Sequence, residues 1–125
     1  RMGRVWHDTR GTLTVSLAFQ CEKPLRDIPQ MAFVASLALY ETAKTFAPHA
    51  PFSLKWPNDV MLDGMKMAGL LVEIHTRKGA PLPWIIIGMG VNVAASPTVK
   101  ERTVACLGDV VPQPPLPGHF LTHFL

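Results

Sequence analysis

The chain has 125 residues, of which 48% are hydrophobic, and twelve basic and nine acidic residues give it a net charge of +3. These values predict one folded domain with a core and exclude a chain that is disordered over most of its length. The apolar runs are far too short to span a membrane. The small positive charge favours anionic partners but does not define a nucleic-acid-binding surface. The two cysteines, Cys21 and Cys106, lack metal-binding or redox spacing, which is typical of buried thiols in a reducing cytoplasmic protein.

The first half of the chain predicts one strand and one long helix. Residues 12–19 alternate between apolar side chains and polar or small ones, which indicates a half-buried strand. Asp27, with Gln30 three residues later, is typical of a capped helix start, so we expect a helix from about 28 to 46. Few polar residues occur before Glu41, and this helix is therefore expected to be buried on most of its circumference.

The middle of the chain predicts a meander of strands. Residues 52–56 and 60–62 are expected to be extended, and the Asp-Gly pair at 63–64 is a strong hairpin signal. The return strand is expected over residues 66–76, and a further strand follows over 84–93 after a second turn.

After residue 93 the apolar pattern weakens. Residues 112–117 are rich in proline and predict a stiff loop, and residues 118–125 predict the first turns of a helix. The order of strand, helix and hairpin-rich strands favours an α+β fold, with a mainly antiparallel, mixed sheet and its helices packed on one face.

Four polar side chains lie in or beside the predicted hairpin: Lys55, Asn58, Asp59 and Lys66. Two ammonium groups beside a carboxylate and an amide suit a polyanion such as a nucleotide phosphate chain, and Asp59 could hold Mg²⁺ or orient a lysine. The alternative is a hairpin with ordinary surface ion pairs. Residue types alone leave both interpretations open.

Two glycines interrupt the last predicted strand. Gly88 and Gly90 could let a flat ligand lie against the sheet, with Asn92 hydrogen-bonding it, or they could belong to a bulged core strand. A dinucleotide-binding fingerprint is excluded, because Val93 occupies the third glycine position and no helix follows.

The beginning of the chain is basic and aromatic. Arg1, Gly3, Arg4 and Trp6 could form a loop that wraps an anionic ligand, with Arg1 as a bidentate clamp, or they could form a frayed terminus. The five histidines do not predict a metal site, since His119 and His123 have helical spacing but no third ligand.

Several blocks together resemble the biotin–protein ligase family, whose members include the biotin–[acetyl-CoA-carboxylase] ligases. The blocks are Lys-Trp-Pro-Asn-Asp at 55–59, Lys-Met-Ala-Gly-Leu-Leu-Val-Glu at 66–73 and Ile-Gly-Met-Gly-Val-Asn-Val at 87–93, in the family's order and spacing. Residues 1–6 resemble the end of that family's glycine- and arginine-rich biotin-binding loop. The resemblance is good to about residue 93 and weak beyond it.

The resemblance implies a fold like that of the class II aminoacyl-tRNA synthetases and a two-step ligase reaction. Biotin and MgATP would give biotinyl-5′-AMP, and a lysine of a biotin carrier domain of a carboxylase would then take the biotinyl group. Biotin is thus the implied substrate, with ATP and Mg²⁺. The implied partner is the carrier domain, with a homodimer possible and neither membrane nor nucleic acid expected.

The resemblance also assigns roles to residues, by motif position. The catalytic residues implied are Lys66, Arg1 and Asp59, with Asp59 also the implied Mg²⁺ ligand. The biotin-binding residues implied are Arg1, Gly3, Lys66, Gly69, Leu71, Gly88 and Gly90. The ATP-binding residues implied are Arg4, Trp6, Lys55, Asn58, Asp59, Lys66 and Asn92.

The motifs leave alternatives open. Compared with the family, residues 1–125 are expected to form a partial catalytic domain that lacks the first part of the biotin loop and the C-terminal β-domain. A lipoate–protein ligase or acyltransferase of the same fold is one alternative. A non-catalytic module that binds biotin or biotinyl-AMP is another, and the missing loop residues motivate it.

Overall fold

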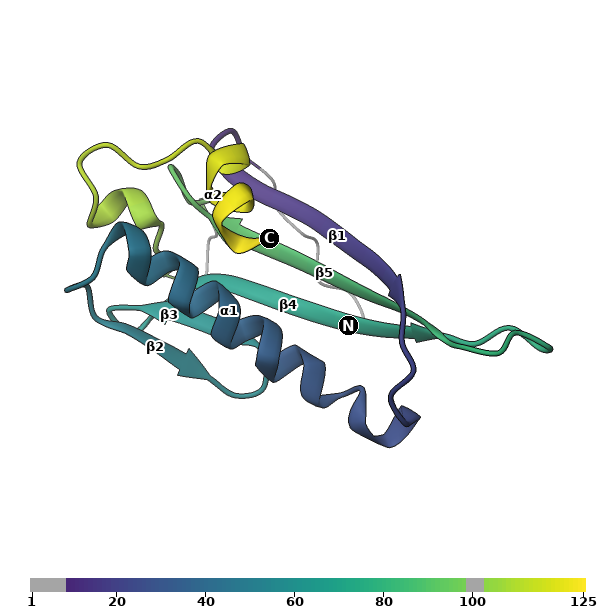
Figure 1. The fold of residues 1–125 in the computed structure, drawn as a ribbon. Helices are drawn as coiled ribbons and strands as arrows, with labels where there is room; N and C mark the ends of the chain where they lie inside the picture. The colour runs from purple at the N-terminus through teal and green to yellow at the C-terminus, as the bar shows by residue number, and fades with distance from the viewer. Residues whose placement is uncertain (1–8, 99–102) are drawn as a thin grey trace.

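The structure is a computed structural model that describes residues 9–98 and 103–125. Its described part forms a five-stranded sheet, two α-helices and two short 3₁₀ turns (Figure 1). In chain order the elements are β1 (Thr12–Gln20), a 3₁₀ turn (Leu25–Asp27), α1 (Gln30–Phe46), β2 (Phe52–Lys55), β3 (Asp59–Leu62), β4 (Met65–His75), β5 (Trp84–Asn92), a second 3₁₀ turn (Leu107–Asp109) and α2 (Pro117–Phe124).

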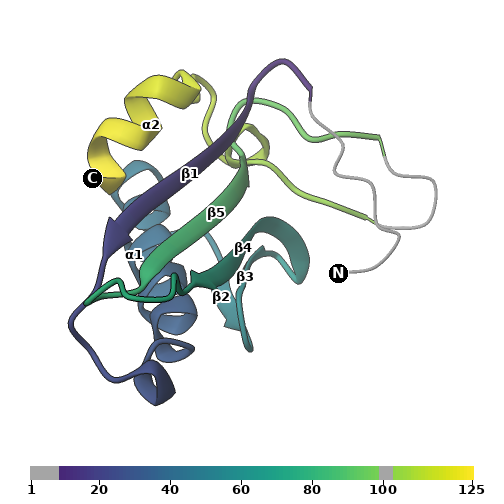
Figure 2. The same ribbon diagram turned by 90° about the vertical axis from the view of Figure 1, so that its right-hand side faces the viewer.

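The strands lie in the order β1-β5-β4-β3-β2, and each neighbouring pair is antiparallel. A parallel bridge joins Lys66 to Val104, outside the named strands. Both helices lie on one face of the sheet (Figure 2). The predicted α+β architecture, with helices on one face of a mainly antiparallel sheet, is therefore confirmed.

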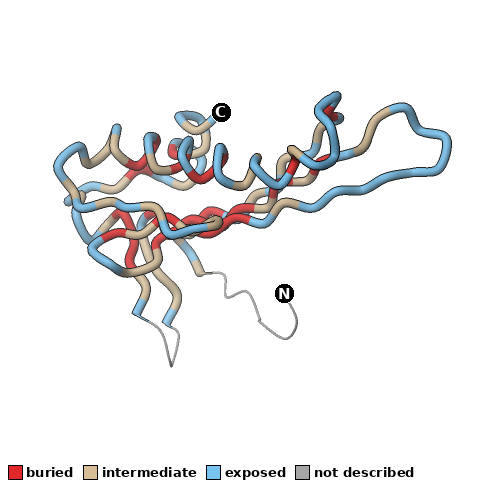
Figure 3. The backbone as a smooth tube through the Cα atoms, turned by 90° about the horizontal axis from the view of Figure 1, so that it is seen from below, coloured by how far each residue is buried: buried red, intermediate tan, exposed pale blue. Residues whose placement is uncertain are grey.

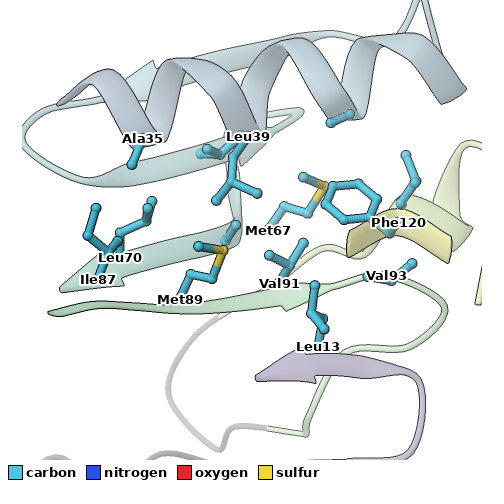
Figure 4. Close-up of a cluster of buried hydrophobic side chains, with 14 of the residues drawn as sticks. Leu13, Ala35, Leu39, Met67, Leu70, Ile87, Met89, Val91, Val93 and Phe120 are labelled. Carbon is cyan, nitrogen blue, oxygen red and sulfur yellow. The ribbon is translucent and has the colours of Figure 1, made fainter. Parts of the chain in front are cut away.

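The core lies between the helices and the sheet (Figure 3). In β5 every second residue faces the helices, among them Met89 and Val91, which are 3% and 1% exposed. Leu39 of α1 and Phe120 of α2 are fully buried against this layer (Figure 4). The helices therefore cover one set of alternate strand residues and leave the other set on the opposite face.

The predicted cap of α1 is wrong. Asp27 lies in the first 3₁₀ turn, where its backbone N–H donates to the carbonyl of Pro24. The helix begins at Gln30 after Pro29 at the N-cap, without a side-chain cap. Leu25–Asp27 therefore form a separate 3₁₀ turn before the helix, whereas the sequence predicted that the helix would begin directly after Asp27.

The predicted burial of α1 on most of its circumference is also wrong. One stripe, including Ala35, Leu39 and Ala43, packs toward the sheet. On the outer side, Phe33 and Val34 remain 50% and 65% exposed. A single sheet covers only one side of a helix, so apolar residues around the whole circumference do not all become buried.

The hairpin between β3 and β4 has the predicted Asp-Gly turn. Asp63 and Gly64 both have positive φ, of 49° and 72°. Positive φ at both central residues is the conformation that joins two twisted antiparallel strands in a two-residue loop.

Gly64→Ala is expected to lower the free energy of unfolding by about 1–2 kcal/mol, the cost of placing a Cβ in the left-handed region. A Cβ at Gly64 would meet no atom within 4 Å, so the cost is one of backbone conformation alone. Chemical denaturation measures it. Gly118 in α2 is the matched control: it is equally open but lies in a helix, so Gly118→Ala should stabilise by about 0.5–1 kcal/mol. Equal effects of the two substitutions on the free energy of unfolding would contradict the assignment of a positive φ to Gly64.

Candidate active site

One row of residues crosses the whole sheet on the face opposite the helices. The strand register places Lys55 opposite Asp59, Asp59 opposite Gly69, and Gly69 opposite Gly90. Thr14 of β1 lies opposite Gly90 and completes the row. Because residues opposite one another in antiparallel strands share a face, the sheet aligns four of the predicted site residues.

A β-bulge brings Lys66 onto the same face. Lys66 and Gly69 are three residues apart, and a regular strand would place them on opposite faces. The pairing of β3 with β4 shifts between Val60 and Met61, and this leaves Met67 without a partner in β3. Met67 turns into the core and is 1% exposed (Figure 4). Lys66 then lies on the face that carries Gly69.

Lys66 and Asp59 form an ion pair at the centre of this face. The Lys66 Nζ lies 2.6 Å from Asp59 Oδ1, and the two side chains keep 39% and 23% of their surface exposed. A Cβ at Gly69 would lie 2.6 Å from the same Nζ and 3.2 Å from the same carboxylate oxygen. Because Gly69 has no side chain, it leaves the space that the Lys66 ammonium occupies.

Lys55 and Asn58 flank this pair. Lys55 ends β2 with an exposed side chain, and no ion pair involves it in the described parts of the chain. The Asn58 side chain donates through Nδ2 to the carbonyl of Leu70, whose own N–H donates to the Asn58 carbonyl at 3.0 Å. Asn58 thus fixes the turn before β3 against β4, a contact that the sequence did not indicate.

The next row of the same face contains another glycine, Gly88, beside an exposed leucine. Gly88 lies opposite Leu71 on one side and Ser16 on the other, and Leu71 is 49% exposed. A Cβ at Gly88 would meet Ser16 Oγ at 3.7 Å, an ordinary contact. Ser16 and Thr14 also lie on this face and were not among the predicted site residues, although the polar side of the strand at 12–19 already grouped them.

Residues 103–106, here called the strap, are bonded to Lys66 and to Asn92. The Asn92 Nδ2 donates to the carbonyl of Ala105 at 2.9 Å, and the Ala105 N–H donates to the carbonyl of Lys66 at 3.0 Å. Asn92 is thus linked through Ala105 to Lys66, and its amide nitrogen is bonded to the strap. The weak pattern after residue 93 gave no indication of this segment.

Cys106, at the end of the strap, is 5% exposed and bonds to Asp109. Burial raises the pKa of the Cys106 thiol above its ordinary value of 9.0, and the hydrogen bond and charge of Asp109 raise it further. The folded chain therefore holds this proton more tightly than the unfolded chain. The resulting stabilisation is complete below the unfolded pKa and is lost as the pH rises through the folded pKa.

We therefore expect the difference in unfolding free energy between the wild type and Cys106→Ala to shrink between about pH 8 and about pH 10. Chemical denaturation of both proteins at the two pH values measures this difference. Other groups that titrate in this pH range are present in both proteins, so their effects cancel. A difference that stays constant would contradict the raised pKa.

The four N-terminal candidates, Arg1, Gly3, Arg4 and Trp6, lie outside the described residues. Within residues 9–98 and 103–125, no group of three or more histidine, cysteine, aspartate or glutamate side chains could hold a metal ion. The Asp59 carboxylate on the open face could nevertheless supply one ligand to a magnesium ion that phosphates also hold. Neither described helix is long and apolar enough to cross a membrane.

Comparison with known proteins adds to this geometry. The sequence model of the Biotin/lipoate A/B protein ligase family matches residues 1–92. A biotin–[acetyl-CoA-carboxylase] ligase of Paracoccus denitrificans is 37% identical over 98 residues, which is 78% of this chain and 40% of that protein. The bifunctional ligase/repressor BirA of Bacillus subtilis is 34% identical over 98 residues, covering 78% of this chain and 30% of that protein.

The fold is similar to that of solved biotin protein ligases. The Aquifex aeolicus enzyme, solved in complex with biotin and ATP, has a TM-score of 0.77 at 27% identity and is matched over 99% of this chain and 51% of its own. The chain therefore spans about half of that enzyme and less than half of the curated relatives. The match over residues 1–92, most of this chain, shows that the chain belongs to the biotin/lipoate A/B protein ligase family.

Proposed function

We propose that the protein attaches biotin to a lysine of a biotin carrier domain, with ATP as the energy source and biotinyl-5′-AMP as the intermediate. The observation that carries this proposal is the Lys66–Asp59 pair, held at 2.6 Å beside Gly69 and Gly90 on the open face of the sheet. An ammonium group beside a surface that glycines leave open suits a molecule with a flat apolar part that ends in a carboxylate. The ligase names of the relatives support the same reaction class.

In the first step a carboxylate oxygen of biotin attacks the α-phosphorus of ATP and pyrophosphate leaves. Negative charge on the carboxylate and on the α-phosphate oxygens meets at the reacting centre. The Lys66 ammonium would lie beside both groups and neutralise this charge, and Asp59 would hold the ammonium in place. This scheme requires no nucleophilic side chain, because the carboxylate of biotin performs the attack.

In the second step the ε-amine of the carrier lysine attacks the carbonyl carbon of the mixed anhydride. The bond between this carbon and the oxygen that bridges to phosphorus breaks, AMP leaves with that oxygen, and the amine loses a proton. Asp59, whose carboxylate lies at this centre, would accept this proton or orient the amine. Lys66 would stabilise the departing phosphate, so the same pair serves both steps.

The remaining candidates are proposed to surround this centre. Gly69, Leu71, Gly88 and Gly90 would line the biotin slot, Lys55 and Asn58 would contact the nucleotide, and Asn92 would lie at the edge of the nucleotide site. Among residues outside the described parts, Arg1 and Gly3 are proposed to close over biotin, and Arg4 and Trp6 to contact the nucleotide. A magnesium ion would neutralise the triphosphate, with Asp59 as its protein ligand.

The proposal extends to partners and location. The carrier domain of a biotin-dependent carboxylase is the proposed protein substrate, because the relatives are named for such carboxylases. We further propose a cytoplasmic location, consistent with free cysteines at positions 21 and 106. Homodimer formation is proposed from the family resemblance alone.

The test is labelling of a purified biotin carrier domain by the full-length protein with ATP and biotin. Mass spectrometry should show one added biotinyl group on one lysine, and pyrophosphate should appear with biotin even without the carrier. Tight binding of biotinyl-AMP without pyrophosphate release would instead favour a non-catalytic binding module.

A lipoate–protein ligase is the second candidate, because the matching family includes both types. Competition separates the two. If lipoate suppresses the formation of labelled biotinyl-AMP only at concentrations far above those of biotin, the site is of the biotin type. The reverse order of preference would assign lipoate as the substrate.

A further inference from the structure

The backbone of Lys66 lies beyond the end of the β4–β5 ladder. The pairing of β4 with β5 begins at Ala68 and Val91, so β5 provides no partner for Lys66. On its other side Lys66 pairs with Met61, directly beside the bulge. One strand edge next to a bulge would hold this residue poorly, since a bulge interrupts the regular ladder.

The strap takes the place that β5 leaves empty. The Ala105 N–H donates to the Lys66 carbonyl at 3.0 Å, and Val104 forms a parallel bridge with Lys66. Ala105 is fully buried. The position of Lys66 on the open face therefore depends on a segment nearly forty residues away in the sequence.

Asn92 holds the strap in this position. Its Nδ2 donates to the Ala105 carbonyl at 2.9 Å, so both backbone polar groups of this buried residue are bonded, one to Lys66 and one to Asn92. A second hydrogen bond, from the Gly108 N–H to the Val93 carbonyl at 2.9 Å, also holds the chain after the strap against the end of β5. Asn92 is the side chain that connects the end of β5 to the strap at the level of Lys66.

We propose that Asn92 is a positioning residue for Lys66. It holds the strap against the Lys66 backbone and thereby sets the Lys66 ammonium beside Asp59. This inference rests on the proposed function, in which Lys66 acts at the reacting centre. It differs from a direct contact between Asn92 and the nucleotide, because the effect passes through Ala105 and the chain of hydrogen bonds.

The test is Asn92→Asp in the full-length protein, which keeps the size of the side chain and removes the donor to Ala105. We expect amide hydrogen exchange at Ala105 to accelerate in the absence of substrates, because the strap opens locally. We expect kcat for adenylate formation to fall by about ten- to a hundredfold through misplacement of Lys66. The KM for ATP should change by less than about twofold.

Ser36→Ala is the matched control. It also removes a buried hydrogen bond from a side chain to a backbone carbonyl, that of Ala32 at 2.7 Å, but it lies in α1 on the other face of the sheet. It should leave both kcat and the exchange at Ala105 unchanged. If Ser36→Ala lowers kcat as much as Asn92→Asp does, the effect is general destabilisation and the proposal is overturned.

The remaining outcomes separate the two proposals. An Asn92→Asp enzyme with raised KM for ATP, unchanged kcat and unchanged exchange at Ala105 would mean that Asn92 binds the nucleotide directly, and would overturn the positioning role. A wild type that forms no adenylate from biotin or lipoate would overturn the proposed function itself.

Discussion

Lys66→Ala is expected to slow biotin-dependent pyrophosphate release by about a hundredfold or more, the usual cost of removing one group that stabilises developing charge. The reason is geometric: Lys66 is the cation whose Nζ lies at the centre of the open face, 2.6 Å from Asp59. Its loss would leave the carboxylate of biotin and the α-phosphate to approach beside an unneutralised Asp59. Because the ammonium is partly exposed, the fold should survive the change, and the kinetics can be compared at equal protein concentration.

Lys44→Ala is the control for the general loss of a lysine. Lys44 belongs to α1 on the opposite face, where its ammonium lies 5.6 Å from the centre of the Tyr40 ring. This variant should retain the wild-type rate. If Lys66→Ala releases pyrophosphate as fast as the wild type and Lys44→Ala do, Lys66 is not at the reacting centre and the proposed mechanism is wrong.

Gly69→Ala is expected to have the second-largest effect, about ten- to a hundredfold on kcat, because it displaces the same ammonium without removing it. The new Cβ would lie 2.6 Å from Lys66 Nζ and 2.8 Å from Cε, so the end of the side chain must move. A flexible side chain yields easily, and we expect a folded protein with a misplaced lysine. Steady-state kinetics of adenylate formation, with circular dichroism to check the fold, measure this effect.

Gly88→Ala provides the comparison on the neighbouring row. Its Cβ would meet protein atoms at 3.7 Å or more and would not touch Lys66. If this glycine makes room for biotin, the substitution should raise the KM for biotin and leave kcat nearly intact. Equal losses of kcat in Gly69→Ala and Gly88→Ala would show that the clash with Lys66 is not what limits the reaction.

Short-range signals predicted much of the fold. Alternation at residues 12–19 gave β1, and the Asp-Gly pair at 63–64 gave the hairpin, with both residues at positive φ as expected. The same hairpin brought Lys66 to Asp59, as the sequence suggested. These features depend on side-chain period and turn chemistry, which a single sequence displays directly.

Long-range features could not be predicted in the same way. The apolar sequence of α1 does not say which side the sheet will cover, so the exposure of Phe33 and Val34 was not foreseen. The strap depends on Asn92 meeting Ala105 across a segment without any clear pattern. The bulge at Met67 left a trace in the sequence, an unbroken run of apolar or small residues at 67–70, but only the register of β3 shows that this run contains a bulge.

The bulge makes the site sensitive to the regularity of β4 as well as to residue identity. Without it, β4 would alternate regularly, and Lys66, three residues before Gly69, would point toward α1. Deleting Met67 would shorten this spacing to two residues, and a regular strand would then keep Lys66 and Gly69 on the same face. A variant that straightens β4 without changing its length could therefore keep every polar residue of the row and still lose the ammonium from the ligand side.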